Sequence, residues 1–130
     1  MTRKVEFWNP PSATQPFGPY SLVAGVSADA ELLFFSGQVG IGIDGSVPQS
    51  IEKQYELALR SIFALLTESG SSPENVVKLT TYIVEPIDPV ALRRIRSEIL
   101  GEIRPAATML YVPRLLSDDL LVEIDAVAVR

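Results

Sequence analysis

The chain has 130 residues, 16 acidic and 11 basic side chains, a net charge of −5, and neither histidine nor cysteine. This length is typical of one domain, here 1–130. Nucleic acids and anionic membranes attract clusters of cations, so the negative charge argues against both partners. The one basic cluster, at 92–96, has helical spacing and favours a solvated helix face. Lack of histidine and cysteine excludes a thiol nucleophile, an imidazole base, a disulfide and the usual zinc ligands.

The N-terminal segment carries no signal-like apolar stretch, and no apolar run reaches membrane-spanning length, so we expect a cytoplasmic location. Residues 8–19 contain four prolines and predict an irregular, stiff segment. Strands are predicted over 20–28 and 31–41, joined as an antiparallel hairpin at Asp29 and Ala30. The glycine-rich residues 40–46 lack the spacing of a phosphate-binding loop and predict a turn.

The second half of the chain alternates helices and strands. Apolar side chains at three- and four-residue spacing predict a helix from Ile51 to Leu66, stopped by Gly70. A β-branched strand is expected over 75–85. The next helix is capped by Asp88, carries Pro89 at its first position and ends at Gly101. The final strands, near 106–112 and 120–129, are expected to pair antiparallel.

These elements predict an α+β fold with the order β-β-α-β-α-β-β. Two helices would cover one face of a mixed sheet of four or more strands. No linker, repeat or low-complexity tract divides the chain.

Few residues stand out for chemistry. In the last strand, Glu123 and Asp125 lie on one face and could perform acid–base chemistry, although a solvated sheet face has the same pattern. Ser36 and Gly37 end an apolar strand, which suits either a ligand contact or a β-bulge. Tyr20 begins a strand, where a tyrosine is more often a core residue with a wet edge than a site residue.

The ordered set of stretches GPYS (18–21), FFSGQ (34–38), NVVKLTTYIV (75–84), RPA (104–106) and VEIDAVAV (122–129) resembles the RidA/YjgF family over essentially the whole chain. The resemblance implies a domain similar to a chorismate-mutase subunit and a homotrimer with clefts between subunits. It also implies cofactor-independent hydrolysis of reactive enamines or imines to a 2-oxo acid and ammonia. Glu123 resembles the carboxylate that holds the attacking water. Tyr20, Ser36 and Gly37 match other cleft positions.

Three positions depart from the family pattern. Active members carry the motif P-A-R-S, whose arginine pairs with the substrate carboxylate, and Ala107 stands at that arginine position. Ile87 stands where many members have asparagine, and Met109 where cysteine is frequent. Arg114 does not share the odd-numbered face of the strand that carries Ala107, and Pro105 changes the chain direction between Arg104 and that position, which leaves an arginine of a neighbouring subunit as the alternative.

These departures leave two main hypotheses. In the first, the cleft hydrolyses an imine or enamine that is less anionic, larger or more apolar than a short 2-imino acid. Glu123 would then act as general base and Tyr20 as proton donor. In the second, a non-catalytic trimer binds a metabolite or a partner. A ribonuclease or translation-inhibitor role, reported for some relatives, is a third option, and the negative charge and absent histidine argue most strongly against ribonuclease activity.

Overall fold

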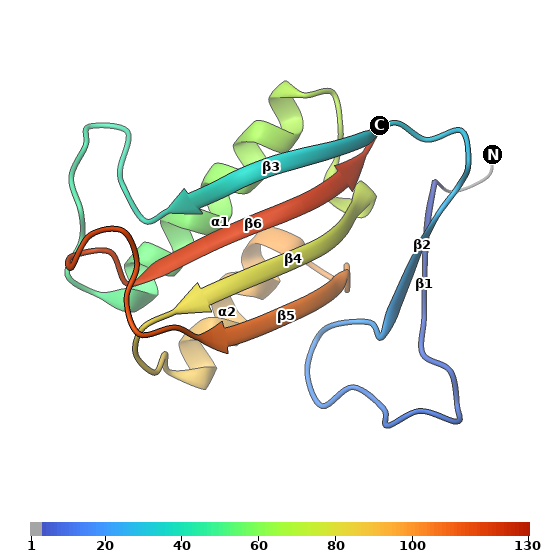
Figure 1. Ribbon diagram of the computed structural model, residues 1–130, viewed down its shortest axis with the longest axis horizontal. Helices are drawn as coiled ribbons and strands as arrows, with labels where there is room; N and C mark the ends of the chain where they lie inside the picture. Colours follow the sequence, from blue (N-terminus) through green and yellow to red (C-terminus); the bar gives the residue numbers. More distant parts are fainter. Residues whose placement is uncertain (1–3) are drawn as a thin grey trace.

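The main sheet contains β3 (Leu32–Val39), β6 (Val122–Val129), β4 (Val76–Ile83) and β5 (Ala106–Tyr111), in that spatial order (Figure 1). The structure, a computed structural model, describes residues 4–130. Strand β6 runs antiparallel to β3 and β4, whereas β4 and β5 are parallel. The predicted mixed sheet is therefore confirmed.

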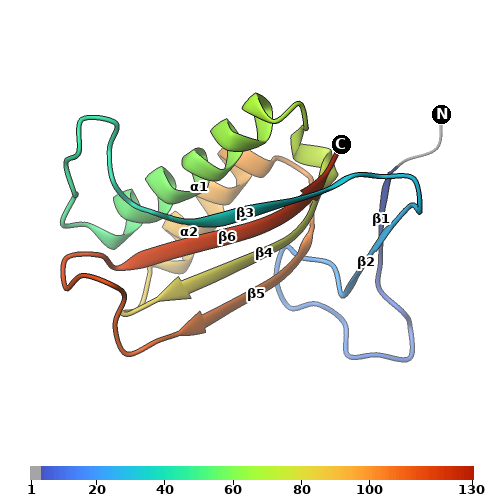
Figure 2. The same ribbon diagram turned by 45° about the horizontal axis from the view of Figure 1, so that its top comes forward.

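Both predicted hairpins are wrong. Strand β2 (Val23–Val26) pairs with an unpredicted strand, β1 (Val5–Trp8), in a separate ribbon beside one end of the main sheet (Figures 1 and 2). Strand β3 pairs with β6 instead, because the chain bends after β2 and Glu31 then exchanges backbone hydrogen bonds with Arg130. At the other end, β5 joins β4, and β6 takes the place between β3 and β4.

The two predicted helices are confirmed. Helix α1 (Ile51–Glu68) begins after Ser50, whose side chain accepts a bond from the Lys53 amide. Gly70, with φ of 75°, lies just beyond its end. Helix α2 (Pro89–Leu100) is capped by Asp88, whose carboxylate accepts from Ala91, and ends at Gly101. A short 3-10 turn, η1 (Pro73–Asn75), precedes β4.

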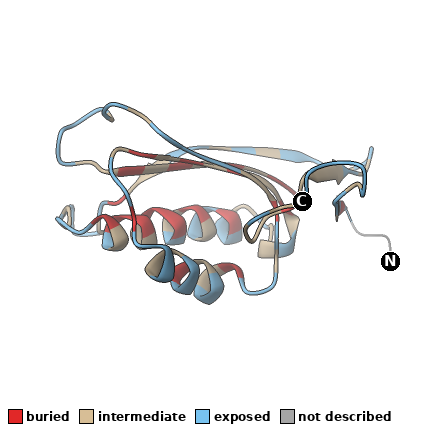
Figure 3. Ribbon diagram, turned by 90° about the horizontal axis from the view of Figure 1, so that it is seen from below, coloured by how far each residue is buried: buried red, intermediate tan, exposed pale blue. Residues whose placement is uncertain are grey.

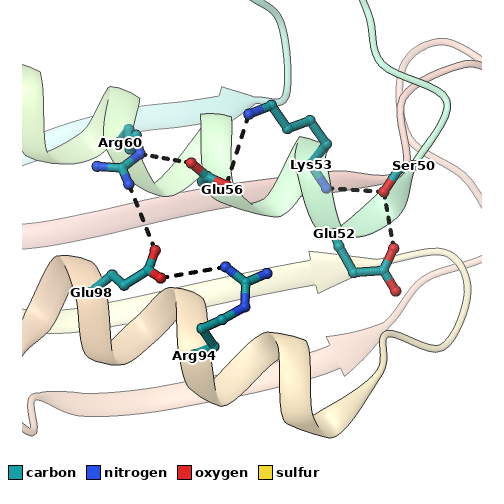
Figure 4. A network of polar contacts seen from close by, with 7 residues as sticks. All are labelled: Ser50, Glu52, Lys53, Glu56, Arg60, Arg94 and Glu98. Carbon is teal, nitrogen blue, oxygen red and sulfur yellow. Dashed lines mark hydrogen bonds and ion pairs between the residues drawn. The ribbon is translucent and has the colours of Figure 1, made fainter.

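Both helices pack on one face of the main sheet and leave the other face open (Figure 3). One ion pair links the helices at the surface, where Arg60 of α1 lies 4.0 Å from Glu98 of α2, and Glu98 also lies 3.4 Å from Arg94 of its own helix (Figure 4). Exposed pairs of this kind contribute about 0–1 kcal/mol each, so apolar burial holds the layers together. No helix within residues 4–130 is long and apolar enough to cross a membrane. The core includes Tyr55, Leu59, Ile62, Leu66, Leu79, Ile95, Val122 and Ile124.

A buried glutamine ties two loops to α1. The Gln54 side-chain amide donates to the carbonyls of Pro48 (2.8 Å) and Asp119 (2.9 Å), and its carbonyl accepts from the Leu121 amide (2.8 Å). Because Gln54 is fully buried, its loss leaves three backbone groups without their partner.

We therefore expect Gln54→Leu, which keeps the size of the side chain, to lower the free energy of unfolding by about 3 kcal/mol. Urea denaturation followed by circular dichroism measures this change. Gln49→Leu, at an exposed position before the helix, is the matched control and should change stability by less than about 0.5 kcal/mol. Equal effects of the two substitutions would contradict the proposed role of Gln54.

Candidate functional site

Glu123 lies on the open face of the sheet, directly against the backbone of Gly37. The β3–β6 register shifts between Phe35 and Gln38, so Ser36 and Gly37 form a β-bulge, one of the two alternatives left open for this stretch. A Cβ atom added at Gly37 would lie 2.8 Å from Glu123 Cδ and would overlap the carboxylate. Only glycine therefore leaves room for the Glu123 carboxylate in this position.

A tyrosine that sequence reasoning missed lies beside Glu123. Tyr82 on β4 pairs with Glu123 in the β4–β6 register, and its hydroxyl donates to Asp125 Oδ2 at 3.1 Å. The hydrogen bond to Asp125 and the nearby carboxylate charges raise the pKa of Tyr82, which keeps its phenol protonated. Lys78, Thr80 and Tyr82 are spaced two residues apart in the strand, and this period of two could have placed Tyr82 on the open face from the sequence alone.

Two other predicted residues lie on the opposite face. Ala107 pairs with Leu79, and Met109 pairs with Thr81 in the parallel β4–β5 register. Paired residues share a face of the sheet, and both Leu79 and Thr81 are buried beneath the helices. Ala107 and Met109 therefore face the helix layer, although Met109 at the sheet edge stays 39% exposed.

Tyr20 lies beside the first residues of β5. Its neighbour Ser21 bridges to Ala106 and donates through its hydroxyl to the Arg104 carbonyl at 2.6 Å. On the other side of Tyr20, the Pro19 carbonyl accepts from an Arg96 guanidinium nitrogen at 3.0 Å. These contacts hold Tyr20 beside the start of β5 and near Ala107.

Ile87 and the two candidate substitute arginines lie apart from both clusters. Ile87 is 9% exposed and packs in the core just before α2, so its site role stays a prediction. Arg114 forms an ion pair with Asp118 at 2.9 Å in the loop after β5. Arg104 lines a groove beside α2 that none of the predicted site residues lines. Neither arginine replaces a guanidinium at position 107 within one chain.

The predicted site thus divides into two clusters. The carboxylate cluster contains Ser36, Gly37 and Glu123 on the open face; the β5-edge cluster contains Tyr20, Ala107 and Met109. Strand β4 lies between β6 and β5, and neighbouring strands lie about 4.8 Å apart, so about 10 Å and the thickness of the sheet separate the clusters. No group of three or more possible metal ligands occurs among residues 4–130.

The sequence profile of the family described as Endoribonuclease L-PSP matches residues 11–130. A RutC family protein from Pyrococcus abyssi is 33% identical over 132 residues, covering 100% of this chain and 99% of that protein.

Two solved structures agree with this result. A protein of the conserved Rid family, YyfB from Yersinia pestis, has a TM-score of 0.83 and 25% identity, covering 98% of this chain and all of its own. Escherichia coli TdcF, named "Putative reactive intermediate deaminase", is 28% identical over 134 residues, covering 100% of this chain and 98% of its own. Its structure with bound serine has a TM-score of 0.69 and covers 91% of this chain and 93% of its own. The chain belongs to the RidA/YjgF family, as its ordered motifs indicated.

Proposed function

We propose that this protein hydrolyses a small reactive imine or enamine in a cleft between subunits of a homotrimer. The division of the site carries the proposal: Glu123 and Ala107 lie on opposite faces of one sheet, so one chain cannot bring them to the same substrate. In a closed ring, the carboxylate cluster of one copy meets the β5-edge cluster of the next. The name of the TdcF relative supports the reaction class.

Exposed apolar side chains support such an assembly. On the open face, Phe34 is 76% exposed and Leu32 is 50% exposed; at the β5 edge, Tyr111 is 63% exposed. Strand β5 is also an edge strand with unpaired backbone groups. Apolar surface and an open sheet edge are both features that subunit contacts cover.

The chemistry needs a positioned water and a proton donor. In imine hydrolysis, water adds to the C=N carbon and the nitrogen gains a proton; the resulting carbinolamine then releases ammonia and leaves a carbonyl. Glu123 would accept a proton from the attacking water, and Tyr20 of a neighbouring copy would donate toward nitrogen. Positioning supplies most of the acceleration, since this hydrolysis is intrinsically easy.

The substrate differs from a short 2-imino acid. An arginine at position 107 would form a charge-assisted bond to a substrate carboxylate, and Ala107 cannot. Met109, which is 39% exposed at the sheet edge, adds apolar surface at a position where a cysteine is frequent in the family. We therefore propose an imine without a carboxylate, or one with a larger apolar side chain.

A panel of imines tests this function. Amine oxidase would generate carboxylate-free imines in situ, and amino-acid oxidase would generate 2-imino acids, including 2-iminopropanoate. We expect this protein to accelerate decay of carboxylate-free or bulky imines at least tenfold, with negligible effect on 2-iminopropanoate. Glu123→Gln should abolish the acceleration.

Glu68→Gln, at the exposed end of α1, is the matched control and should retain the acceleration. Native mass spectrometry should show a trimer for all three proteins. No acceleration of any imine, or full activity in Glu123→Gln, would contradict the proposed reaction. A monomer would contradict the shared cleft.

One observation favours a second candidate, binding without turnover. Ala107 replaces the arginine that binds the substrate carboxylate in active relatives, whereas the cleft residues Tyr20 and Glu123 are retained. Saturable binding of an amine or carbonyl compound, with no imine hydrolysis, would support this alternative.

A further inference from the structure

A groove of about 700 Å³ runs between the outer side of α2 and the segment before Tyr20. It is lined by four arginines and one glutamate, although the whole chain has a net charge of −5. The groove is distinct from both clusters described above, because its lining includes no predicted site residue. The basic members are Arg93, Arg94, Arg96 and Arg104, and the acidic member is Glu102.

Two of these arginines already have partners. Arg94 pairs with Glu98 at 3.4 Å on the side of α2 that faces α1 (Figure 4). Arg96 is held in place, since it donates to the Pro19 carbonyl and lies beside the buried hydroxyl of Tyr55. Burial raises the pKa of Tyr55, and the positive charge of Arg96 offsets part of this effect. Arg96 thus contributes a fixed positive charge to the groove.

The other two arginines are available to a ligand. Arg93 and Arg104 are exposed, and within residues 4–130 neither has an acidic side chain within ion-pair distance. Arg93 comes from α2 and Arg104 from the segment just before β5. Guanidinium groups from two elements in one groove favour a phosphate, which each can bind through two parallel N–H bonds.

The groove also offers apolar contacts. Phe17 lines it and is 95% exposed, and its ring packs against Tyr20 with perpendicular planes and centroids 5.9 Å apart. Leu100, Ile103 and Pro19 supply further apolar lining. The exposed phenyl ring of Phe17 and the guanidinium groups of the same groove suit a ligand with an aromatic ring and a phosphate. The ring of the ligand can stack on Phe17 while its phosphate binds the arginines.

From these features we infer that the groove is a second ligand site, which binds a small phosphorylated compound with an aromatic ring, of the nucleoside monophosphate class. Arg93 and Arg104 bind the phosphate, and Phe17 stacks on the ring. Phe17 also contacts Tyr20, so a ligand stacked on Phe17 would be linked through this one side chain to the β5-edge cluster. The inference does not depend on the reaction proposed above.

Titration calorimetry with adenosine 5′-monophosphate as the probe tests the inference. We expect saturable binding that weakens as ionic strength rises, because salt screens the arginines. The double variant Arg93→Gln/Arg104→Gln should weaken binding by about a hundredfold or more, from about tenfold for each charge-assisted contact. Arg114→Gln, at an exposed arginine elsewhere, is the matched control and should bind like the parent.

Three further probes separate the contributions. Adenosine and pyrophosphate should each bind more weakly than the monophosphate, and Phe17→Ala should weaken the monophosphate but leave pyrophosphate unchanged. Undetectable binding of the monophosphate at millimolar concentration would overturn the inference, as would parent-like binding by the double variant. Pyrophosphate binding as tightly as the monophosphate would overturn the aromatic part. Tighter binding of a short RNA would reassign the groove to nucleic acid.

Discussion

Replacing Ala107 with arginine is expected to give this protein activity toward 2-iminopropanoate and 2-iminobutanoate. The new guanidinium would pair with the substrate carboxylate, a contact that contributes about 1.5–3 kcal/mol. This energy corresponds to an increase in kcat/KM of about 10- to 150-fold. Position 107 is partly exposed at the edge strand β5, so the longer side chain can extend past the sheet edge. Decay of the imines, generated in situ by amino-acid oxidase, measures the gain.

A charge-matched control distinguishes placement from net charge. Thr108 is the next residue on β5, but it lies on the open face, where its hydroxyl accepts from Lys78 Nζ at 3.0 Å. Thr108→Arg adds the same charge and should give no gain. The gain in Ala107→Arg should also disappear when Glu123→Gln is added. Equal gains from both arginines, or no gain from an intact Ala107→Arg trimer, would contradict the carboxylate-binding role of this position.

The helices and the alternation of β6 were predictable because their signals are local. Apolar spacing defined α1, and Asp88, Pro89 and Gly101 delimited α2 to the residue. In β6, Val122 and Ile124 are fully buried whereas Glu123 is not, as the period of two indicated. Each of these features depends on neighbours within a few residues.

Strand pairing was not predictable in the same way. Strands β1 and β2 pair across the proline-rich segment between them, and β3 pairs with a strand some ninety residues away. Nothing in a four-residue strand specifies its partner, and the Asp29–Ala30 bend lacks the glycine that makes a two-residue hairpin turn. Long-range register is decided by which face is buried.

The same limit applies to the candidate site. The resemblance selected Glu123 and Ala107 together, but their opposite faces follow from the parallel β4–β5 register, which was not predicted. The interaction of Tyr82 with Asp125 depends on the same pairing of β4 with β6. Motifs therefore indicate candidate residues, whereas the sheet order determines which of these residues one chain can bring together.

Gly37→Ala should damage activity more than stability, because the bulge leaves no space between Gly37 and the Glu123 carboxylate. The added methyl would overlap the carboxylate, so Glu123 must move. Because the overlapping atoms lie at the free end of a flexible side chain and Gly37 is exposed, we expect the free energy of unfolding to fall by at most about 1 kcal/mol. Imine hydrolysis should fall by about 100-fold, since a displaced general base loses most of its contribution. Urea denaturation and the imine assay measure the two effects.

A double-mutant cycle tests the cause. In a Glu123→Ala background the carboxylate is absent, so adding Gly37→Ala should cost less than about 0.5 kcal/mol. The difference between the two backgrounds then measures the clash itself, independently of any effect that alanine has on the β3 backbone. An equal cost in both backgrounds would show that Gly37 is needed for the bulge alone. In that case a different feature of the open face would have to position Glu123.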